Sequence, residues 1–355
     1  MLKYRMPAEW EKHEGTLLSW PHLKSDWPGK FEPIPWVYTE IVKKLSFGEK
    51  VYIIIDPKIR KKSVIAMLEM NGVNMDNIEF IPIANNRGWS RDNAPAFVYT
   101  PKDKVKAIRF KFNAWSKYKN YQKDKYIPEE VANHLEIGIK DAIYHEKLVV
   151  LEGGAIDVNG KGTLITTEEC LMDQETQVRN KDFSKYNYEN VFAEYLGITN
   201  VLWLGKGIAG DDTHGHVDDL CRFSDEKTLV MVSEDNPDDE NYAILQENWE
   251  RAQDFMLEDG SKPRLVKLPM PKPIIFDGMK LPASYANFYI GNEVVLVPTF
   301  NDKNDRIALN ILADLFPGRE VIGISAIDLI WGLGTLHCLT HEVPAFKYKE
   351  DTGKE

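Results

Sequence analysis

The chain contains little cysteine: its 355 residues include three, Cys170, Cys221 and Cys338, far apart in sequence. An odd number of widely spaced thiols argues against a disulfide framework and leaves a free thiol to explain. A lone cysteine is more often a small buried hydrophobe than a reactive group, and we expect Cys170 and Cys221 to be packing residues of this kind. The sequence also lacks long apolar runs. Its apolar stretches are short, such as VYIII and VVLVP, so no segment is expected to span a membrane.

An excess of basic residues is also missing. Lys and Arg number 44 against 55 Asp and Glu, which gives a formal net charge of −11. This balance disfavours nucleic-acid binding and would weakly attract a cationic small molecule. The opening MLKYRMPAEWEKHEG has no apolar segment of the length that a signal peptide needs, so we expect a cytoplasmic protein. No low-complexity tract or proline-rich linker interrupts the sequence, and we expect residues 1–355 to form one domain.

Acid, imidazole and thiol groups occur beside glycine or turn residues in separate blocks. These are GWSRDNAP around Asp92, LEGGAID around Glu152, GDDTHGHVDD around His216 and Asp218, and GLGTLHCLT around Cys338. A cysteine attacks as its thiolate, and carboxylates in the same pocket raise the thiol pKa unless a cation lies between them. A thiol, an imidazole and several carboxylates together therefore indicate a cationic substrate.

The blocks recur at a nearly constant interval. Asp92, Glu152 and His216 are separated by 60 and 64 residues, and Cys338 follows His216 by 122, close to two further intervals. A block of similar appearance, SYANFYIGNEVVLVPTFN around residue 290, lies in this gap but brings no titratable candidate. We interpret this as a degenerate repeat of about 60 to 70 residues, in which each unit offers one loop to a common centre.

The pattern of elements is mixed α/β throughout. Runs rich in β-branched and aromatic residues predict strands, and apolar periodicity predicts helices between them. The strands are expected at 51–55, 78–83, 107–112, 148–151, 162–166, 201–204, 228–232, 264–268, 294–297 and 319–324. The helices are expected at 36–45, 61–70, 127–135, 186–196, 242–256 and 306–316.

Together the blocks resemble the agmatine deiminase branch of the guanidine-modifying, or pentein, superfamily. The resemblance runs from MPAEW through the Trp-x-Arg-Asp block, FNAW, LEGGAID, LITTEECL, the Asp-Thr-x-Gly-His-Val-Asp block and LPASYANFYI to LHCLT. It implies a pentein α/β-propeller of five ββαβ units with pseudo-fivefold symmetry around a central active-site channel. It also implies a hydrolase acting on the C–N bonds of linear amidines, without metal or organic cofactor.

The resemblance also assigns roles to residues. Asp92 and Asp218 match the carboxylates that clamp the guanidinium, Cys338 matches the nucleophile, and His216 matches the general acid and base. Glu152 matches the carboxylate that supports this imidazolium. These residue types suit the chemistry, because a planar cation with several N–H donors needs opposed acceptors and a strong nucleophile above its plane.

For the substrate tail, the resemblance places Trp89 beside the aliphatic chain and Asp212 at the distal ammonium of agmatine. It supplies no arginine for an α-carboxylate, which disfavours free arginine. The sequence differs from the pattern usual for agmatine deiminases at three expected pocket positions, His214, Thr335 and Leu336. The expected partner is a small cationic guanidino substrate on the route to putrescine. A homodimer is compatible with the resemblance, but the sequence does not determine the oligomeric state.

Other interpretations stay open at this point. The substrate could be peptidyl-arginine or another guanidino compound, and a non-catalytic binding protein could share the same fold. His214 and His216, together with His337, Cys338 and His341, could by composition furnish zinc ligands.

Overall fold

The computed structural model describes residues 3–346, and within them the strands form small separate sheets. Four of these sheets have three strands, in the orders β4-β5-β6, β9-β10-β11, β12-β13-β14 and β17-β18-β19, and one has four, in the order β20-β1-β2-β3. Their bounds are β1 His13–Ser19, β2 Lys50–Ile55, β3 Ile78–Pro82, β4 Ala96–Tyr99, β5 Val105–Arg109, β6 Gly138–Asp141, β9 Asp157–Val158, β10 Thr163–Thr167, β11 Asn200–Leu204, β12 Cys221–Asp225, β13 Thr228–Ser233, β14 Arg264–Pro269, β17 Tyr289–Ile290, β18 Val294–Thr299, β19 Glu320–Ser325 and β20 Thr340–Pro344. Two hairpins, β7 (Ile143–Tyr144) with β8 (Lys147–Leu148) and β15 (Ile274–Phe276) with β16 (Met279–Leu281), stand apart.

The three-stranded sheets repeat one pattern. In each, the first strand pairs antiparallel with the second, and the second pairs parallel with the third after a helical crossover. A parallel pair needs such a crossover, so the unit is ββαβ. The first strands β4, β9, β12 and β17 begin 61, 64 and 68 residues apart. This interval confirms the repeat predicted from the spacing of the sequence blocks.

The four-stranded sheet has the same pattern, but its strands come from the first hundred residues and from the region after Cys338. β20 pairs antiparallel with β1, and β1 pairs parallel with β2 after helix α1 (Ile34–Ser46). β3 adds a further parallel strand. The strand that follows Cys338 therefore lies beside the first strand of the chain.

The longer helices are amphipathic crossovers with recognisable ends. Besides α1 they are α2 Lys61–Met70, α4 Ile127–His134, α6 Lys185–Leu196, α7 Glu240–Ala252 and α8 Lys303–Leu315. Ser184 and Asn187 form a capping box that starts α6, and Gly197 ends it in the left-handed region at φ 74°. Asp302 and Asp305 form a similar box at α8.

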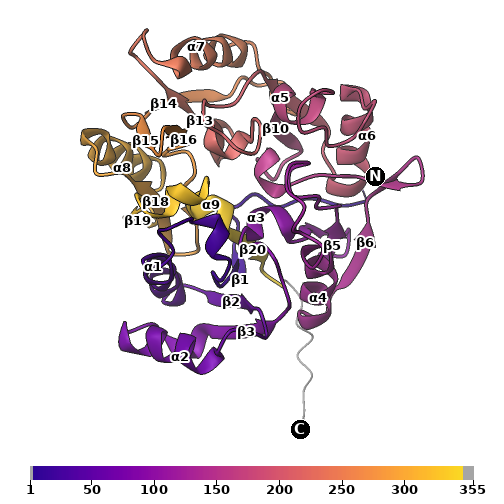
Figure 1. Ribbon diagram of the computed structural model, residues 1–355. Helices are drawn as coiled ribbons and strands as arrows, with labels where there is room; N and C mark the ends of the chain where they lie inside the picture. Colours follow the sequence, from indigo (N-terminus) through magenta and orange to yellow (C-terminus); the bar gives the residue numbers. More distant parts are fainter. Residues whose placement is uncertain (1–2, 347–355) are drawn as a thin grey trace.

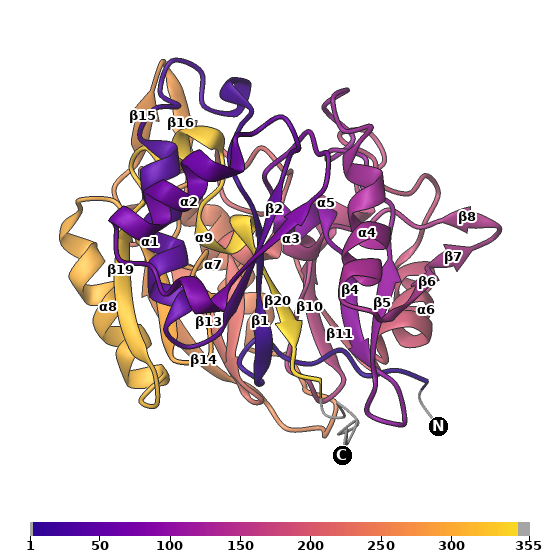
Figure 2. The same cartoon turned by 90° about the horizontal axis from the view of Figure 1, so that it is seen from below.

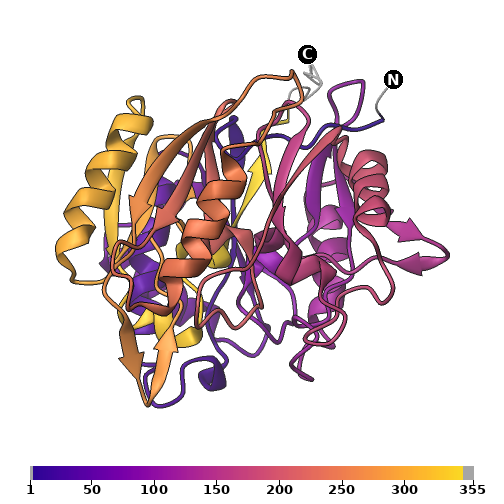
Figure 3. The ribbon, with the colours of Figure 1, turned by 90° about the horizontal axis from the view of Figure 1, so that it is seen from above.

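Short helical turns interrupt the loops. They are α3 Ser90–Asn93, α5 Glu168–Met172, α9 Leu336–Leu339 and the 3₁₀ turns η1 Lys24–Asp26, η2 Met75–Asn77, η3 Asp124–Tyr126, η4 Gly153–Ala155, η5 Val217–Asp219 and η6 Leu329–Gly332. Figure 1 shows α3 and α9 near the centre of the molecule, while α2, α6, α7 and α8 lie at its outside. Figures 2 and 3, from below and above, show α1 and α8 on one side, α4 and α6 on the other, and the strands of the sheets between them.

The apolar core reaches the centre of the molecule. Its largest cluster joins residues of β2, β13 and β18 with α1, and it also includes Trp89, Trp115 and Cys338. The centre is therefore a low-dielectric environment in which paired charges interact strongly. Within residues 3–346, no helix is both long and apolar enough to cross a bilayer.

The predicted elements occur where the sequence indicated, with local corrections. The helix expected at 242–256 ends at Ala252, because the chain turns there to pack Phe255 and Leu257 against the core. The strand expected at 148–151 is paired in a hairpin only to Leu148, and the extended residues after it lead to Glu152. The strands β1, β4, β6, β9, β12, β17 and β20 of the main sheets and the turns α3 and α9 were not predicted.

Candidate active site

The predicted site residues occupy equivalent places in the repeat, just before the first strand of a unit. Asp92 lies in α3 before β4, and Glu152 precedes η4 and β9. His216 and Asp218 lie at η5 before β12, and Cys338 lies in α9 before β20. Each unit thus delivers one short turn to the centre, as the spacing predicted.

A cavity of about 200 Å³ opens at this centre. Of the predicted residues, Trp89, Asp92, Asp212 and Cys338 line it. Glu152, His216 and Asp218 are almost completely buried and are not part of the lining. The cavity therefore has the thiol and one carboxylate at its wall, with the imidazole and two further carboxylates behind them.

His216 lies among three carboxylates. Its Nδ1 is 3.9 Å from Asp92 Oδ1 and 4.0 Å from Asp218 Oδ1, and its Nε2 is 3.8 Å from Glu152 Oε2. Neither ring nitrogen has a hydrogen-bond partner among the described residues, although both are buried. Burial works to lower the pKa of His216, but Asp92, with Cys170 and Glu152, raises it well above its ordinary value. These surroundings therefore favour the protonated, imidazolium form of the ring.

The Asp92 carboxylate is held from both sides. Its Oδ2 accepts a hydrogen bond from Trp115 Nε1 at 2.8 Å, and its Oδ1 accepts one from the backbone N–H of Gly154 at 3.0 Å. Burial raises the pKa of Asp92, and His216 offsets this only in part. A cation bound at this carboxylate would favour its ionised form.

Glu152 is fully buried and paired with Arg179. The Arg179 Nε is 3.1 and 3.2 Å from the two Glu152 oxygens. Burial works to raise the pKa of Glu152, but Arg179 and His216 outweigh it, and the pKa is lowered. Glu152 therefore supplies a fixed negative charge beside the His216 ring.

Asp218 is held by a second histidine. His337 Nδ1 lies 2.7 Å from Asp218 Oδ2, and His337 Nε2 lies 2.8 Å from Glu9 Oε2. An ionised carboxylate only accepts hydrogen bonds, so both contacts are satisfied when both ring nitrogens carry a proton. Burial works to raise the pKa of Asp218, and His337 lowers it below its ordinary value. The other oxygen, Asp218 Oδ1, is buried with no hydrogen-bond partner among the described residues.

The Cys338 thiol faces one amide donor and several acids. Asn287 Nδ2 donates a hydrogen bond to Cys338 Sγ at 3.1 Å and another to Asp219 Oδ1 at 3.0 Å. The Asn287 oxygen accepts from the backbone N–H of His337 at 3.0 Å. Burial, followed by Asp218, Asp219 and Asp92, raises the pKa of Cys338 well above its ordinary value. The group is therefore a thiol until positive charge arrives.

Trp89 and Asp212, the two residues expected at the tail of the substrate, have different surroundings. Trp89 is buried and packs against Trp27, with ring centroids 5.4 Å apart. Asp212 lines the cavity, but both of its oxygens are engaged: Oδ1 by Lys117 Nζ at 2.6 Å and Oδ2 by the hydroxyl of Tyr118 at 2.7 Å. An incoming ammonium would compete with Lys117 at Asp212.

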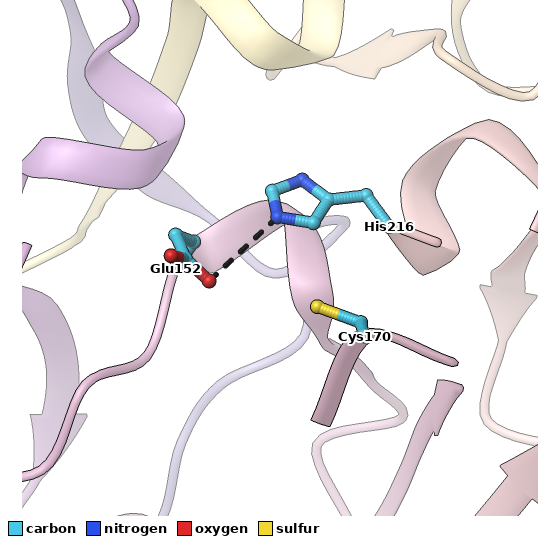
Figure 4. A group of neighbouring side chains, drawn as sticks. All are labelled: Glu152, Cys170 and His216. Carbon is cyan, nitrogen blue, oxygen red and sulfur yellow. Dashed lines mark ion pairs between the residues drawn. The ribbon is translucent and has the colours of Figure 1, made fainter. Parts of the chain in front are cut away.

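Cys170 is buried, as predicted, but its position is unexpected. Figure 4 shows its thiol beside Glu152 and His216, and one ligand atom from each of the three lies within 4.8 Å of the others. Such a group could hold a metal ion. Arg179 already occupies both Glu152 oxygens, however, and its positive charge opposes a cation there.

The zinc ligands that the sequence offered as an alternative do not meet. His214 Nε2 is 2.6 Å from Asp173 Oδ2, and His341 Nε2 is 2.8 Å from the carbonyl of Pro95. His337 is taken up by Asp218 and Glu9. That alternative is wrong, because backbone and carboxylate partners hold the imidazoles apart.

Sequence reasoning missed five groups that complete the site: Glu9, Trp115, Arg179, Asn287 and His337. The repeat pointed to one of them. Asn287 lies just before β17, the place in its unit that Asp92 and Glu152 hold in theirs. The amide of Asn287 does not titrate, so Asn287 was not among the acid, imidazole and thiol groups considered as candidates. The other four residues have partners far away in sequence.

Comparison with known proteins places this architecture in a family. The family model described as Porphyromonas-type peptidyl-arginine deiminase matches residues 5–344. The chain belongs to this family. It is 33% identical to a protein of Latilactobacillus sakei subsp. sakei (strain 23K) named "Putative agmatine deiminase", over 96% of each chain. The predicted resemblance to agmatine deiminases is therefore confirmed.

Solved structures of the family have the same fold. The agmatine deiminase of Enterococcus faecalis, solved catalysing its reaction, matches with a TM-score of 0.87 at 27% identity, over 96% of both chains. An agmatine deiminase of C. jejuni with substrate bound matches with a TM-score of 0.84 at 31% identity, over 98% of this chain and 97% of that one.

Proposed function

We propose that this family member is an agmatine deiminase, a hydrolase that converts agmatine and water to N-carbamoylputrescine and ammonia on the route to putrescine. The observation that carries the proposal is a buried imidazole with two unpartnered ring nitrogens among Asp92, Glu152 and Asp218. Asp218 Oδ2 in turn lies 3.8 Å from the Cys338 thiol at the cavity wall. The full-length relatives named as agmatine deiminases support it.

The guanidinium group of agmatine would supply the positive charge that balances the carboxylates of the site. Asp92 and Asp218 would accept its N–H donors, and Asp218 Oδ1 has an acceptor site open for one of them. Bidentate pairing of a planar cation with carboxylates is strong and directional. It would fix the central carbon within reach of Cys338. The bound positive charge would also lower the thiol pKa, and the thiol proton would leave to solvent.

The reaction then has two halves. The thiolate forms a bond to the guanidinium carbon, and His216 donates its proton to one nitrogen, whose C–N bond breaks to release ammonia. The carbon stays attached to sulfur as an S-alkylthiouronium cation. Water attacks this carbon while the now neutral His216 takes one of its protons. The C–S bond breaks, the hydroxyl proton passes to solvent, and the ureido product and the thiolate separate.

The size of the cavity favours a small substrate over a peptide. About 200 Å³ lies below the roughly 300 to 1,000 Å³ typical of pockets for drug-sized ligands. A peptidyl-arginine or another guanidino compound is the second candidate, because the matching family model carries that description. A non-catalytic role is the remaining alternative.

Several finer expectations belong to the proposal. The five repeated units support a pentein propeller with pseudo-fivefold symmetry around the cavity. Residues 1–355 as one catalytic domain, action in the cytoplasm, a homodimer and Trp89 beside the alkyl chain stay predictions. The expectation that Asp212 binds the ammonium is untested, and Lys117 and Tyr118 already engage both of its oxygens.

Ammonia release from agmatine, free arginine and a blocked arginine peptide tests the proposal. We expect the highest kcat/KM with agmatine, since the cavity is small and acidic. A preference for the blocked peptide would replace agmatine by a peptidyl substrate. Release from none of the three would overturn the deiminase assignment.

A further inference from the structure

The wall of the cavity carries a second carboxylate that the sequence reasoning did not consider. Asp26, in η1, lines the cavity together with Trp89 and Cys338. It is 9% exposed, and its Oδ1 accepts a hydrogen bond from Arg87 Nη1 at 2.6 Å. Its Oδ2 is buried and has no hydrogen-bond partner among the described residues. A buried acceptor left open in a cavity wall is costly unless a ligand or water supplies a donor.

Asp26 and Asp212 differ in what they offer a cation. Both oxygens of Asp212 are already bonded, to Lys117 and Tyr118, so an ammonium there would have to displace Lys117. Asp26 has one oxygen held by Arg87 and one free. An ammonium at Asp26 Oδ2 would gain a charged hydrogen bond without displacing a cation.

Trp89 connects Asp26 to the nucleophile. A Cβ built on Gly334 would lie 2.8 Å from Trp89 Cζ3 and 3.2 Å from Cys338 Sγ, so one edge of the indole is next to the thiol. The Trp89 side chain also acts on Asp26 as a hydrogen-bond donor and works to lower its pKa. The indole thus spans the distance between the reacting end and the Asp26 end of the cavity.

We infer that Asp26, rather than Asp212, binds the distal ammonium of the substrate and selects a guanidine with a cationic tail. This rests on the proposed deiminase function of the same site. Trp89 would cover the methylene chain, and Arg87 would hold Asp26 in place. Electrostatics agree: burial raises the pKa of Asp26 to about 6, although Arg87 and Trp89 lower it, so a bound cation would relieve an unfavourable charge.

Binding in a Cys338→Ser background, which excludes turnover, tests the inference. Isothermal titration compares agmatine with n-pentylguanidine, in which a methyl group replaces the ammonium. We expect agmatine to bind about tenfold or more tightly than n-pentylguanidine. Adding Asp26→Asn should remove most of this preference and change n-pentylguanidine binding by less than about threefold.

Two further variants make the comparison specific. Asp124 is a matched control, since it is also buried beside Arg87 with an unpartnered Oδ2 but does not line the cavity. Asp124→Asn and Asp212→Asn should keep the preference for agmatine. The inference is overturned if Asp26→Asn keeps the preference, if it weakens both compounds equally, or if Asp212→Asn alone removes it. Failure of both compounds to bind would overturn the proposed function together with the inference.

A second measurement covers the case in which Asp26→Asn does not fold. Arg87, Tyr38, Tyr118 and Asp124 are the charged or titratable groups that act on Asp26 or respond to its charge. Near pH 6, agmatine should release more protons on binding than n-pentylguanidine, because its ammonium lowers the pKa of Asp26. The excess release should persist in Asp124→Asn. Equal release by the two guanidines would contradict the inference.

Discussion

At the scale of single residues, the Cys338 thiol depends on charge that the free protein lacks. Three aspartates and burial raise its pKa, and the one side-chain donor to its sulfur among the described residues is the amide of Asn287. A guanidinium between Asp92 and Asp218 would reverse this balance. Under the proposed function, occupation of the site would activate the thiol, which would limit its side reactions when no substrate is present.

The nucleophile assignment predicts the outcome of Cys338→Ser. The change replaces one atom, and the hydroxyl is far less ionised at neutral pH, so turnover should be lost while guanidine binding is kept. We expect the rate of ammonia release to fall more than about a hundredfold, a barrier increase of more than about 2.7 kcal/mol. Activity above that level would mean that another group attacks.

The amide donor predicts a change in pH dependence for Asn287→Asp. The acid keeps an acceptor for Thr335 and the backbone of His337 but places negative charge beside the sulfur. Loss of one hydrogen bond to a charged group, worth about 1.5 to 3 kcal/mol, should lower kcat/KM roughly ten- to hundredfold. The rising limb of the pH–rate profile should move to higher pH.

Thr335→Val is the control for Asn287→Asp, because it removes a bond to the Asn287 oxygen and leaves the donor to sulfur in place. It should leave the rising limb where it is in the unmodified enzyme. An unchanged limb in Asn287→Asp would show that the amide does not act on the thiol.

At the scale of elements, the candidate site residues Asp92 and Cys338 lie in the shortest α-helices. Six longer helices, from α1 to α8, cross over between strands and were predicted from their apolar period. The four-residue turns α3 and α9, which carry Asp92 and Cys338, are too short to show a period of 3.6 residues. Their glycines, acids and prolines mark loops, and tertiary contacts alone make them helical.

The presence or absence of a local sequence pattern also determines which residues of the site could be predicted. Asp92, Glu152, His216 and Cys338 were found because they are acid, imidazole and thiol groups beside glycine or turn residues, in blocks that recur at a nearly constant interval. The structure brings Asp92, Glu152 and His216 together and places Cys338 with Asp92 at the cavity wall. Arg179 and His337 could not be paired with Glu152 and Asp218 from sequence, since no local pattern records contacts between residues 27 and 119 positions apart. Asp26 was missed because η1 contains no block of this kind.

The turn η4 gives a test at this scale. A Cβ on Gly154 would lie 2.5 Å from His216 Nδ1, 3.0 Å from Asp218 Oδ2 and 3.1 Å from Asp92 Oδ1. Gly154→Ala should therefore displace these groups, lowering kcat/KM more than about a hundredfold at a stability cost of about 1 to 3 kcal/mol. Steady-state kinetics and thermal unfolding measure the two effects.

Gly318→Ala is the matched control for Gly154→Ala, because nothing lies within 4 Å of its added Cβ. It should change neither rate nor unfolding temperature noticeably. Near-normal turnover in Gly154→Ala would mean that η4 does not set the spacing of the catalytic groups.

At the scale of the whole molecule, Glu9 joins units that are distant in sequence. Its Oε1 accepts from the backbone N–H of Ile290 at 2.8 Å and lies 3.0 Å from Arg222 Nη2. Its Oε2 accepts from Arg91 Nη2 at 2.9 Å and faces His337. These partners belong to α3, β12, β17 and α9, so one carboxylate connects the turns that form the centre.

Removing this charge should destabilise the whole protein. Glu9→Gln removes one counter-charge from Arg91, Arg222 and His337, which keep Glu342, Asp157 and Asp218 respectively. Breaking a buried ion pair costs about 3 to 5 kcal/mol. Urea unfolding at pH 7 measures it. Glu226→Gln, at an exposed position, should have almost no effect.

The same residue predicts an acid dependence. Burial opposes ionisation of Glu9, but Arg222, His337 and Arg91 lower its pKa well below the ordinary value. Its stabilising contribution is therefore complete above about pH 4.3 and is lost as pH falls towards the folded pKa. The stability difference between the unmodified protein and Glu9→Gln should shrink below this pH, and a constant difference would contradict the assignment.

The pairing of β20 with β1 also predicts the order of events during folding. Residues of these strands lie more than 300 positions apart, so their contact closes a very long loop, which makes such contacts slow to form. Cys338 directly precedes β20. During refolding, the helical signal should recover first and ammonia release last. Until β20 pairs with β1, the chain would hold the acids of the site without a fixed position for the Cys338 thiol, so recovery of activity would report the final folding step.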